Sequence, residues 1–342
     1  MTGYEIIKGN VKFTGPDRIG LRFDRIAGKG DVCRIFVLPP RSTWPEDAHY
    51  TVSKKVRPKS GEYDEWGCLW ESDDSSGSDM GQVSNIPIEE WEDMENYVFP
   101  DPKAEGRFEG LKEALDEAEK KGLYVQLNSP QCIFERMHFL RGFENTLMDC
   151  LIEPEEIEAM AEKLADYQIG IIEEAYRLGE GRVHCYDTTD DWGTQNSLMI
   201  SPDIFREIFK PQYKRIFDKA HECGMDIRFH TDGKINDILE DLIELGVDII
   251  NIHQPRLVGI DEVSAIAQGR ICFEAAIDIQ ATLPTGDKEL IEQEAKELIE
   301  KWATPKGGLI GVEYGYLDAI GTTKESMLYA LECFEKYGNF KK

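Results

Sequence analysis

From about residue 105 to the end of the chain, segments with helical periodicity alternate with short apolar segments typical of strands. Helices are expected over residues 108–121, 154–178, 202–222, 234–245, 261–267, 287–303 and 322–337. Strands are expected over 124–128, 183–187, 226–230, 248–253, 271–277 and 308–313, with an earlier one near 33–38. Ile238, Leu239 and Leu242 fall on one stripe of their helix, as the 3.6-residue period requires.

This alternation predicts an α/β fold, a closed (β/α)8 barrel of the TIM type. The strands are continuous apolar runs, which is typical of a parallel sheet buried on both faces. An open doubly wound sheet is the alternative, but the sequence lacks the Gly-x-Gly-x-x-Gly turn that would support nucleotide binding in such a sheet. We expect residues 1–342 to form one domain, with 105–342 supplying the regular repeats.

Residues 1–104 do not show this regular alternation and are rich in turns. They are expected to supply the first strands and an N-terminal extension that forms a hairpin lid. A polar insert, Glu71 to Asp79, reads ESDDSSGSD between segments rich in Trp and Tyr. Ser, Asp and Gly offer little to bury, so the insert predicts a mobile loop between two strands.

Composition excludes several classes of partner. The formal net charge is −27, which argues against binding to nucleic acid or to an anionic membrane, because both require basic patches. No apolar run approaches the roughly 18 residues of a membrane span. The first residues carry no secretion signal, and the eight cysteines are scattered. A cytoplasmic protein with reduced thiols is therefore expected.

Polar side chains follow almost every predicted strand of the regular repeats. In TIM barrels the chemistry takes place at this C-terminal end of the strands. The side chains concerned are Asn128, Asp187, Asp190, Asp191, Trp192, Gln195, His230, Asp232, His253, Gln254, Asp278, Gln280, Glu313 and Tyr314. Such convergence predicts a functional site at the barrel mouth, by which we mean the C-terminal strand ends and the loops that follow them.

Simpler roles remain open for some of these residues. Asp232 could cap the helix expected from residue 234, and His230 could be a satisfied buried histidine. The acids of DTTDDWG could cap the helix that begins near Pro202. However, Ser201 and Pro202 already supply its cap and first turn, which leaves Asp190 and Asp191 free for another role.

Residues 190–255 resemble the uroporphyrinogen decarboxylase superfamily. They read DDWGTQNSLMISPDIFREIFKPQYKRIFDKAHECGMDIRFHTDGKINDILEDLIELGVDIINIHQP. The shared features are acid-x-Trp-Gly, Ser-Pro opening a helix, His-x-x-Gly after a strand, and Gln-Pro. The resemblance implies a (β/α)8 barrel with its site at the strand C-termini. It also implies either decarboxylation of a tetrapyrrole or zinc-dependent methyl transfer to or from corrinoid (cobalamin-bearing) proteins.

Departures from the family pattern favour methyl transfer. The Arg-x-Ala-Gly-Arg motif of the decarboxylases is missing from FTGPDRIGLRFDRIAGKGDVCRIF, and a charge of −27 suits an octacarboxylate poorly. In thiol-using methyltransferases zinc is held by His-x-Cys and a distant Cys. Here His230 matches the histidine, but both thiolates are replaced by oxygen groups: Asp232 stands in place of the first cysteine, and Glu313 is near the place of the distant one. By this resemblance His230, Asp232 and Glu313 would hold zinc, and an oxygen-rich site suits an oxygen donor.

The leading hypothesis is therefore a methyltransferase that moves a methyl group from a methyl ether (such as a methoxylated aromatic) or a methylamine to a corrinoid protein. Asp190, Asp191 and His230 would be catalytic. The donor would be bound by Trp192, Gln195, Asn128, His253, Gln254, Asp278 and Tyr314. The alternatives are a decarboxylase of a small or tetrapyrrole acid, with Asp190 or His230 as proton donor, and a non-catalytic ligand-binding barrel. Acids at the rim, including Asp73, Asp74 and Asp79, would face a basic corrinoid protein, and family resemblance suggests a homodimer.

Overall fold

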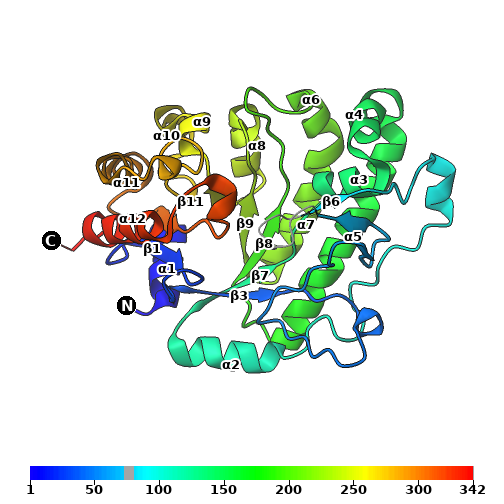
Figure 1. Ribbon diagram of the computed structural model, residues 1–342, viewed down its shortest axis with the longest axis horizontal. Helices are drawn as coiled ribbons and strands as arrows, with labels where there is room; N and C mark the ends of the chain where they lie inside the picture. The colour runs from blue at the N-terminus through cyan, green and yellow to red at the C-terminus, as the bar shows by residue number, and fades with distance from the viewer. Residues whose placement is uncertain (73–80, 342) are drawn as a thin grey trace.

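The computed structural model describes residues 1–72 and 81–341. A nine-stranded sheet curves into a nearly closed barrel surrounded by helices (Figure 1). Its strands are β1 (Gly20–Phe23), β2 (Lys29–Gly30), β3 (Val32–Phe36), β7 (Tyr124–Asn128), β8 (Cys185–Thr189), β9 (Asp226–His230), β10 (Ile249–Ile252), β11 (Cys272–Ala275) and β12 (Leu309–Val312). They pair in the order β2-β1-β12-β11-β10-β9-β8-β7-β3, and β1 with β2 is the antiparallel pair. The predicted TIM-type fold is confirmed.

The outer helices follow the predicted alternation. They are α2 (Leu111–Lys121), α5 (Pro154–Gly179), α6 (Pro202–Ile204), α7 (Lys210–Glu222), α8 (Leu239–Glu244), α10 (Ile260–Ala267), α11 (Lys288–Trp302) and α12 (Lys324–Tyr337). One wide turn, η3 (Phe205–Phe209), joins α6 to α7. Single-turn helices are η1 (Arg41–Thr43), η2 (Trp91–Glu95), η4 (Asn236–Ile238), η5 (Leu283–Thr285) and η6 (Asp318–Ile320).

Four helices were not expected from periodicity: α1 (Gly3–Val11), α3 (Phe134–Arg141), α4 (Phe143–Ile152) and α9 (Pro255–Val258). In α3 the apolar side chains are buried, but so are Arg136 and Arg141. A helix enclosed on both its apolar and its charged faces has no single apolar stripe, so periodicity does not reveal it. In α1, Ile7 and Val11 pack into an inner apolar layer and close the N-terminal end of the barrel.

The N-terminal extension contains a small antiparallel sheet of three strands, where a hairpin was expected. Its strands are β4 (Glu62–Tyr63), β5 (Leu69–Glu71) and β6 (Gln82–Val83), in the order β4-β5-β6. The expected mobile loop begins within β5 at Glu71, and its residues 73–79 lie outside the described part of the chain, together with the rim acids Asp73, Asp74 and Asp79.

The barrel has a seam where β1 and β3 do not pair as strands. The Arg18 guanidinium bridges it by donating two hydrogen bonds of 2.7 Å to the Asp31 carboxylate. Asp31 in turn accepts the Leu21 N–H at 2.9 Å and donates its own N–H to the Leu21 carbonyl at 2.8 Å. The seam is therefore held by one buried carboxylate.

Halfway up the barrel, the inward side chains form a charged layer. It consists of Arg22, Arg34, Asp187, Arg228 and Glu274. Arg228 links the two acids, at 2.5 Å from Asp187 and 2.7 Å from Glu274. Inward positions alternate along a strand, so the next inward residue of β9 after Arg228 is His230. The charged layer therefore lies directly below the residues of the mouth.

Within the described residues, no helix is long and apolar enough to cross a membrane. The cysteines are free thiols, six of them buried, as expected for reduced side chains.

Candidate metal-binding site at the barrel mouth

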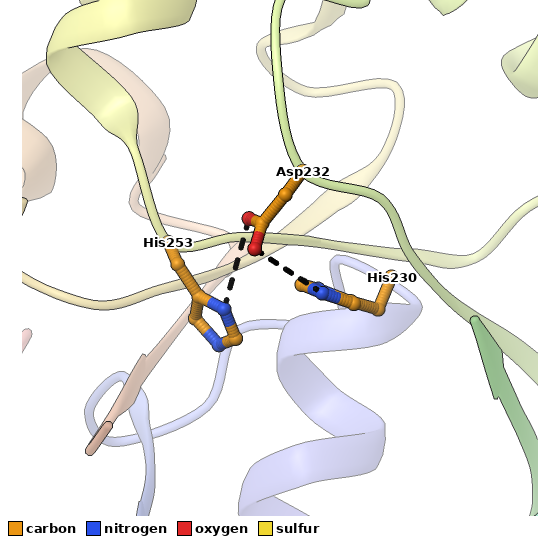
Figure 2. Close-up of side chains that lie close together, drawn as sticks. All are labelled: His230, Asp232 and His253. Atoms are coloured by element: carbon orange, nitrogen blue, oxygen red, sulfur yellow. Dashed lines mark ion pairs between the residues drawn. The ribbon is translucent and has the colours of Figure 1, made fainter. Parts of the chain in front are cut away.

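Three side chains meet at the mouth beside the end of β9. His230 is the last residue of β9, Asp232 follows in the next loop, and His253 follows β10, the neighbouring strand. His230 Nε2 lies 3.6 Å from Asp232 Oδ2, and His253 Nδ1 lies 3.8 Å from Asp232 Oδ1. Figure 2 shows the carboxylate between the two imidazole rings. One donor atom from each residue lies within 4.8 Å of the others.

The donor atoms of this group fit a metal ion. Asp232 Oδ1 and His253 Nδ1 are buried and have no hydrogen-bond partner among the described residues. Burial would raise the pKa of Asp232, but His230 and His253 outweigh it and hold the pKa at about 2. Burial also lowers the pKa of His253. An ionised carboxylate and a neutral imidazole are the forms that bind metal, and two histidines with one carboxylate are a common zinc set with an open position.

The loop that carries Asp232 is shaped by two glycines. Gly233 has φ +84°, and a Cβ there would lie 2.1 Å from the Gly193 carbonyl oxygen. Backbone therefore packs against backbone at this point, which only glycine allows. Asp191 accepts the Asp232 N–H at 2.8 Å, and Gln254 accepts the Gly233 N–H at 3.2 Å. The alternative role of Asp232 as a helix cap is not seen, because its carboxylate turns to the histidines instead.

Asp191 lies beside the three donors. Its Oδ1 is 3.8 Å from His230 Nε2, and its side chain is 40% exposed. Burial within the mouth raises its pKa, with Asp232 adding to the effect and His230 opposing it. Asp191 can therefore both position the loop and exchange protons with a bound molecule.

Asp190 and Trp192 turn away from the mouth, contrary to the expected roles in catalysis and donor binding. The Asp190 carboxylate accepts the N–H groups of Ile133, Phe134 and Glu135 at 2.7, 3.1 and 2.8 Å, and also the Tyr213 hydroxyl. It thereby caps the first turn of α3 from a distant loop. Trp192 is fully buried and stacks on Phe134 with ring centroids 4.0 Å apart. Neither side chain faces the mouth: Asp190 caps α3, and Trp192 packs in the hydrophobic core.

Glu313 does not join the metal-binding group, so its predicted role as a ligand is wrong. Its two carboxylate oxygens accept the N–H groups of Arg25 and Ile26 at 2.6 and 2.9 Å. The reason is strand order: β12 pairs with β1, and two strands separate it from β9. His253, which was expected to bind substrate, stands on the strand next to His230 and takes the third position.

The remaining expected binding residues have different surroundings. Tyr314 packs its ring against His253, with centroids 5.3 Å apart. Asn128 donates to Asp187 at 3.1 Å, and its Oδ1 is buried without a partner among the described residues. Asp278 accepts the N–H groups of Arg256, Gln280 and Ala281 and so caps its own loop. Gln195 is exposed in the loop after β8.

Two features of the mouth were missed. Glu135 accepts a hydrogen bond from Thr189 at 2.7 Å, and burial together with Asp191 and Asp190 raises its pKa well above the usual value. The charged layer was also missed, although a charged residue inside an otherwise apolar strand, as in GLRF, VCRIF and DIRFH, marks it in the sequence.

One comparison with a solved structure agrees with this architecture. A methyltransferase from Methanosarcina mazei has a similar fold, with a TM-score of 0.61 and 16% identity over 80% of this chain and 76% of that chain. A more distant likeness is D-psicose 3-epimerase from Clostridium cellulolyticum H10, with a TM-score of 0.40 and 9% identity over 67% of this chain and 83% of that chain. No curated protein matches the chain. The family model of uroporphyrinogen decarboxylase (URO-D) matches residues 75–317, which is more than half of the sequence. The chain belongs to the uroporphyrinogen decarboxylase (URO-D) family.

Proposed function

We propose that the protein transfers a methyl group from a methyl ether or methylated amine to the corrinoid of a partner protein, with zinc held by His230, Asp232 and His253. The observation that carries the proposal is the half-buried His-Asp-His set at the mouth of a URO-D family barrel, with donor atoms left unpartnered among the described residues. The similarity of fold to a methyltransferase is consistent with it.

In this proposal, zinc bound at the three donors would act as a Lewis acid on the leaving heteroatom of the methyl donor. The protein's own part is to hold that position rigidly. Asp191 and Gln254 fix the backbone of the Asp232 loop, and the Tyr314 ring packs against the His253 imidazole. Ligands whose surroundings are fixed in this way bind metal more tightly than free side chains.

Asp191 is the proposed proton donor to the leaving group. When the methyl–oxygen bond breaks and the methyl group passes to the corrinoid, the oxygen keeps the electron pair and needs a proton. Asp191 is the accessible acid beside His230, and it lies within reach of a group bound at the three donors. Asp190 is unsuited to this role because four hydrogen-bond donors already occupy its carboxylate.

The test combines metal analysis with an assay on a reduced corrinoid protein. Protein purified without a metal-binding tag should contain about one zinc per chain. With the corrinoid protein present, it should methylate the cobalamin from at least one of 4-methoxybenzoate, methoxybenzene or trimethylamine, followed by the cobalamin absorbance, and no methyl transfer should occur without the corrinoid protein. An Asp191→Asn variant should keep its zinc and lose most of the rate with ethers. Protein that lacks zinc, leaves cobalamin unmethylated and releases carbon dioxide from a carboxylic acid would establish the decarboxylase alternative.

A further inference from the structure

We infer that the protein binds a small uncharged aromatic molecule with a hydrogen-bond acceptor, such as an aromatic ketone, at a second site beside His184. His184 directly precedes β8, so this site lies at the N-terminal end of the barrel, whereas the metal-binding residues lie at the opposite ends of the strands. The inference goes beyond the proposed function and does not depend on the reaction at the mouth.

The site is a pocket of about 280 Å³ between α1, α2 and the segments that lead into β7 and β8. An apolar cavity of about 150 Å³ already holds benzene, so this pocket has room for one ring and a short substituent. Leu115, Leu123 and Val125 supply apolar walls. The rings of Tyr4 and His184 also line the pocket, with centroids 4.7 Å apart. Such walls favour a flat, apolar molecule.

His184 supplies one hydrogen-bond donor to this apolar pocket. Its Nδ1 accepts the Val125 N–H at 2.9 Å, so Nδ1 carries no proton and the proton of the neutral ring lies on Nε2. The ring stays neutral at pH 7, because burial lowers the pKa of His184 to about 4, with Lys8 adding to the effect and Asp226 opposing it. The ring is partly exposed, and Nε2 donates to no acceptor among the described residues. A ligand oxygen would supply that acceptor.

The charged side chains that line the pocket already have opposite charges beside them. Arg182 Nη1 lies 2.6 Å from an Asp116 carboxylate oxygen and 3.9 Å from a Glu119 carboxylate oxygen. An ion in the pocket would lose its hydration without meeting an unmatched counter-charge, which is costly. The pocket therefore favours an uncharged ligand.

The walls are held in place by the chain itself. The Thr2 hydroxyl accepts the Glu5 N–H at 3.2 Å, and the Glu5 carboxylate accepts the Thr2 N–H at 2.7 Å, which fixes the first turn of α1. Tyr4 donates its N–H to the Gly122 carbonyl at 2.8 Å and so ties α1 to the end of α2. A preformed pocket binds its ligand at a lower entropic cost.

The position of the pocket indicates what a bound ligand would do. The N-terminal end of a (β/α)8 barrel serves stability, whereas catalysis takes place at the mouth. A ligand in the pocket would contact α1 and α2 together and would stabilise the folded chain by mass action.

The experiment measures binding to the purified full chain by calorimetry, with thermal melting as a second readout. Acetophenone carries a ring and an acceptor oxygen, ethylbenzene carries the ring without the acceptor, and benzoate carries a charge. We expect acetophenone to bind about fivefold more tightly than ethylbenzene, which corresponds to the roughly 1 kcal/mol of a neutral hydrogen bond. Acetophenone should also raise the melting temperature, and benzoate should bind the pocket most weakly of the three.

Leu123→Trp locates the binding, because the larger side chain fills the pocket from its partly exposed wall. For each probe, binding at this site is the part that Leu123→Trp abolishes. The zinc content should stay the same in this variant, since the metal-binding residues lie at the other end of the barrel.

His184→Asn tests the donor. The Asn Oδ1 can still accept the Val125 N–H, but the donor at the Nε2 position is lost. The preference for acetophenone over ethylbenzene should therefore disappear in this variant. His49→Asn is the matched control, at an exposed histidine outside the pocket, and should keep the preference.

Circular dichroism checks that all three variants fold. Acetophenone binding that survives Leu123→Trp, a preference for acetophenone that survives His184→Asn, or the absence of saturable acetophenone binding to the unchanged chain would each overturn the inference.

Discussion

At the scale of single residues, identical side-chain chemistry has different uses at the mouth because the neighbours differ. Asp232 and Glu313 are both carboxylates in loops that follow barrel strands. Glu313 is saturated by two backbone N–H groups, whereas one oxygen of Asp232 has no hydrogen-bond partner among the described residues. A carboxylate that already accepts strong hydrogen bonds must give them up before it can bind a metal, and a buried N–H left behind is costly.

The contrast predicts opposite outcomes for two variants. His253→Ala should reduce zinc affinity by a factor of about 100 or more while the barrel remains folded, because it removes one of three proposed ligands. Glu313→Gln should keep zinc and lose about 1–3 kcal/mol of unfolding free energy, because an amide can accept only one of the two N–H groups. Zinc titration and urea unfolding measure the two effects. Zinc loss in Glu313→Gln with retention in His253→Ala would show that the ligand set is wrong.

At the scale of elements, α3 depends on a residue far away in the sequence. Helices commonly begin at a local capping residue, but Ile133 has no side chain that can cap α3. Asp190, from the loop after β8, accepts three N–H groups of the first turn instead. The Asp190 carboxylate therefore links the start of the helix to the loop that leads into the metal-binding site.

Asp190→Ala should accordingly act on stability and not on the metal. We expect a loss of about 2 kcal/mol or more of unfolding free energy, since a cap is removed and three N–H groups lose their acceptor. Zinc content should not change. Asp191→Asn is the matched control, because Asp191 makes one backbone hydrogen bond where Asp190 makes three. Denaturant unfolding with zinc analysis of both variants checks this; equal stability of the two would contradict the capping role.

At the scale of the whole molecule, the barrel interior is organised in layers. Apolar residues from six strands and α1 fill the N-terminal end, the charged layer lies above them, and the metal-binding residues lie at the mouth. Buried ion pairs contribute little net stability compared with apolar packing, but breaking one leaves an uncompensated charge. The pKa of Glu274 is held far below its usual range: burial would raise it, but Arg22 and Arg228 outweigh burial.

Glu274→Gln should therefore destabilise the protein by about 3–5 kcal/mol at pH 7. A carboxyl group whose pKa is depressed by folding stabilises the folded state above its unfolded pKa of about 4 and loses that contribution as the pH falls. The difference between wild type and Glu274→Gln should shrink as the pH is lowered below about 4. Urea unfolding at several pH values measures it, and a difference that grows toward acid would show that Glu274 is not ionised in the fold.

Several features could be predicted from local sequence alone. The alternation from residue 105 onward specifies the helices and strands of the barrel because the helical and strand periods are expressed within windows of five to fifteen residues. The same pattern places His230, Asp232 and His253 at strand ends, where barrels carry their chemistry. Secondary structure and the placement of a residue at a strand end depend on nearby residues in the sequence, so both can be predicted from the sequence of one protein.

The tertiary structure alone decided which of these groups act together. His253 stands beside His230 because β10 is the neighbour of β9, while Glu313 meets the backbone after β1 because β12 borders that strand. Asp190 turns to α3 for a similar reason. Such choices depend on competition between distant partners for the same oxygen or charge, and that competition begins only when the barrel brings them within hydrogen-bonding range.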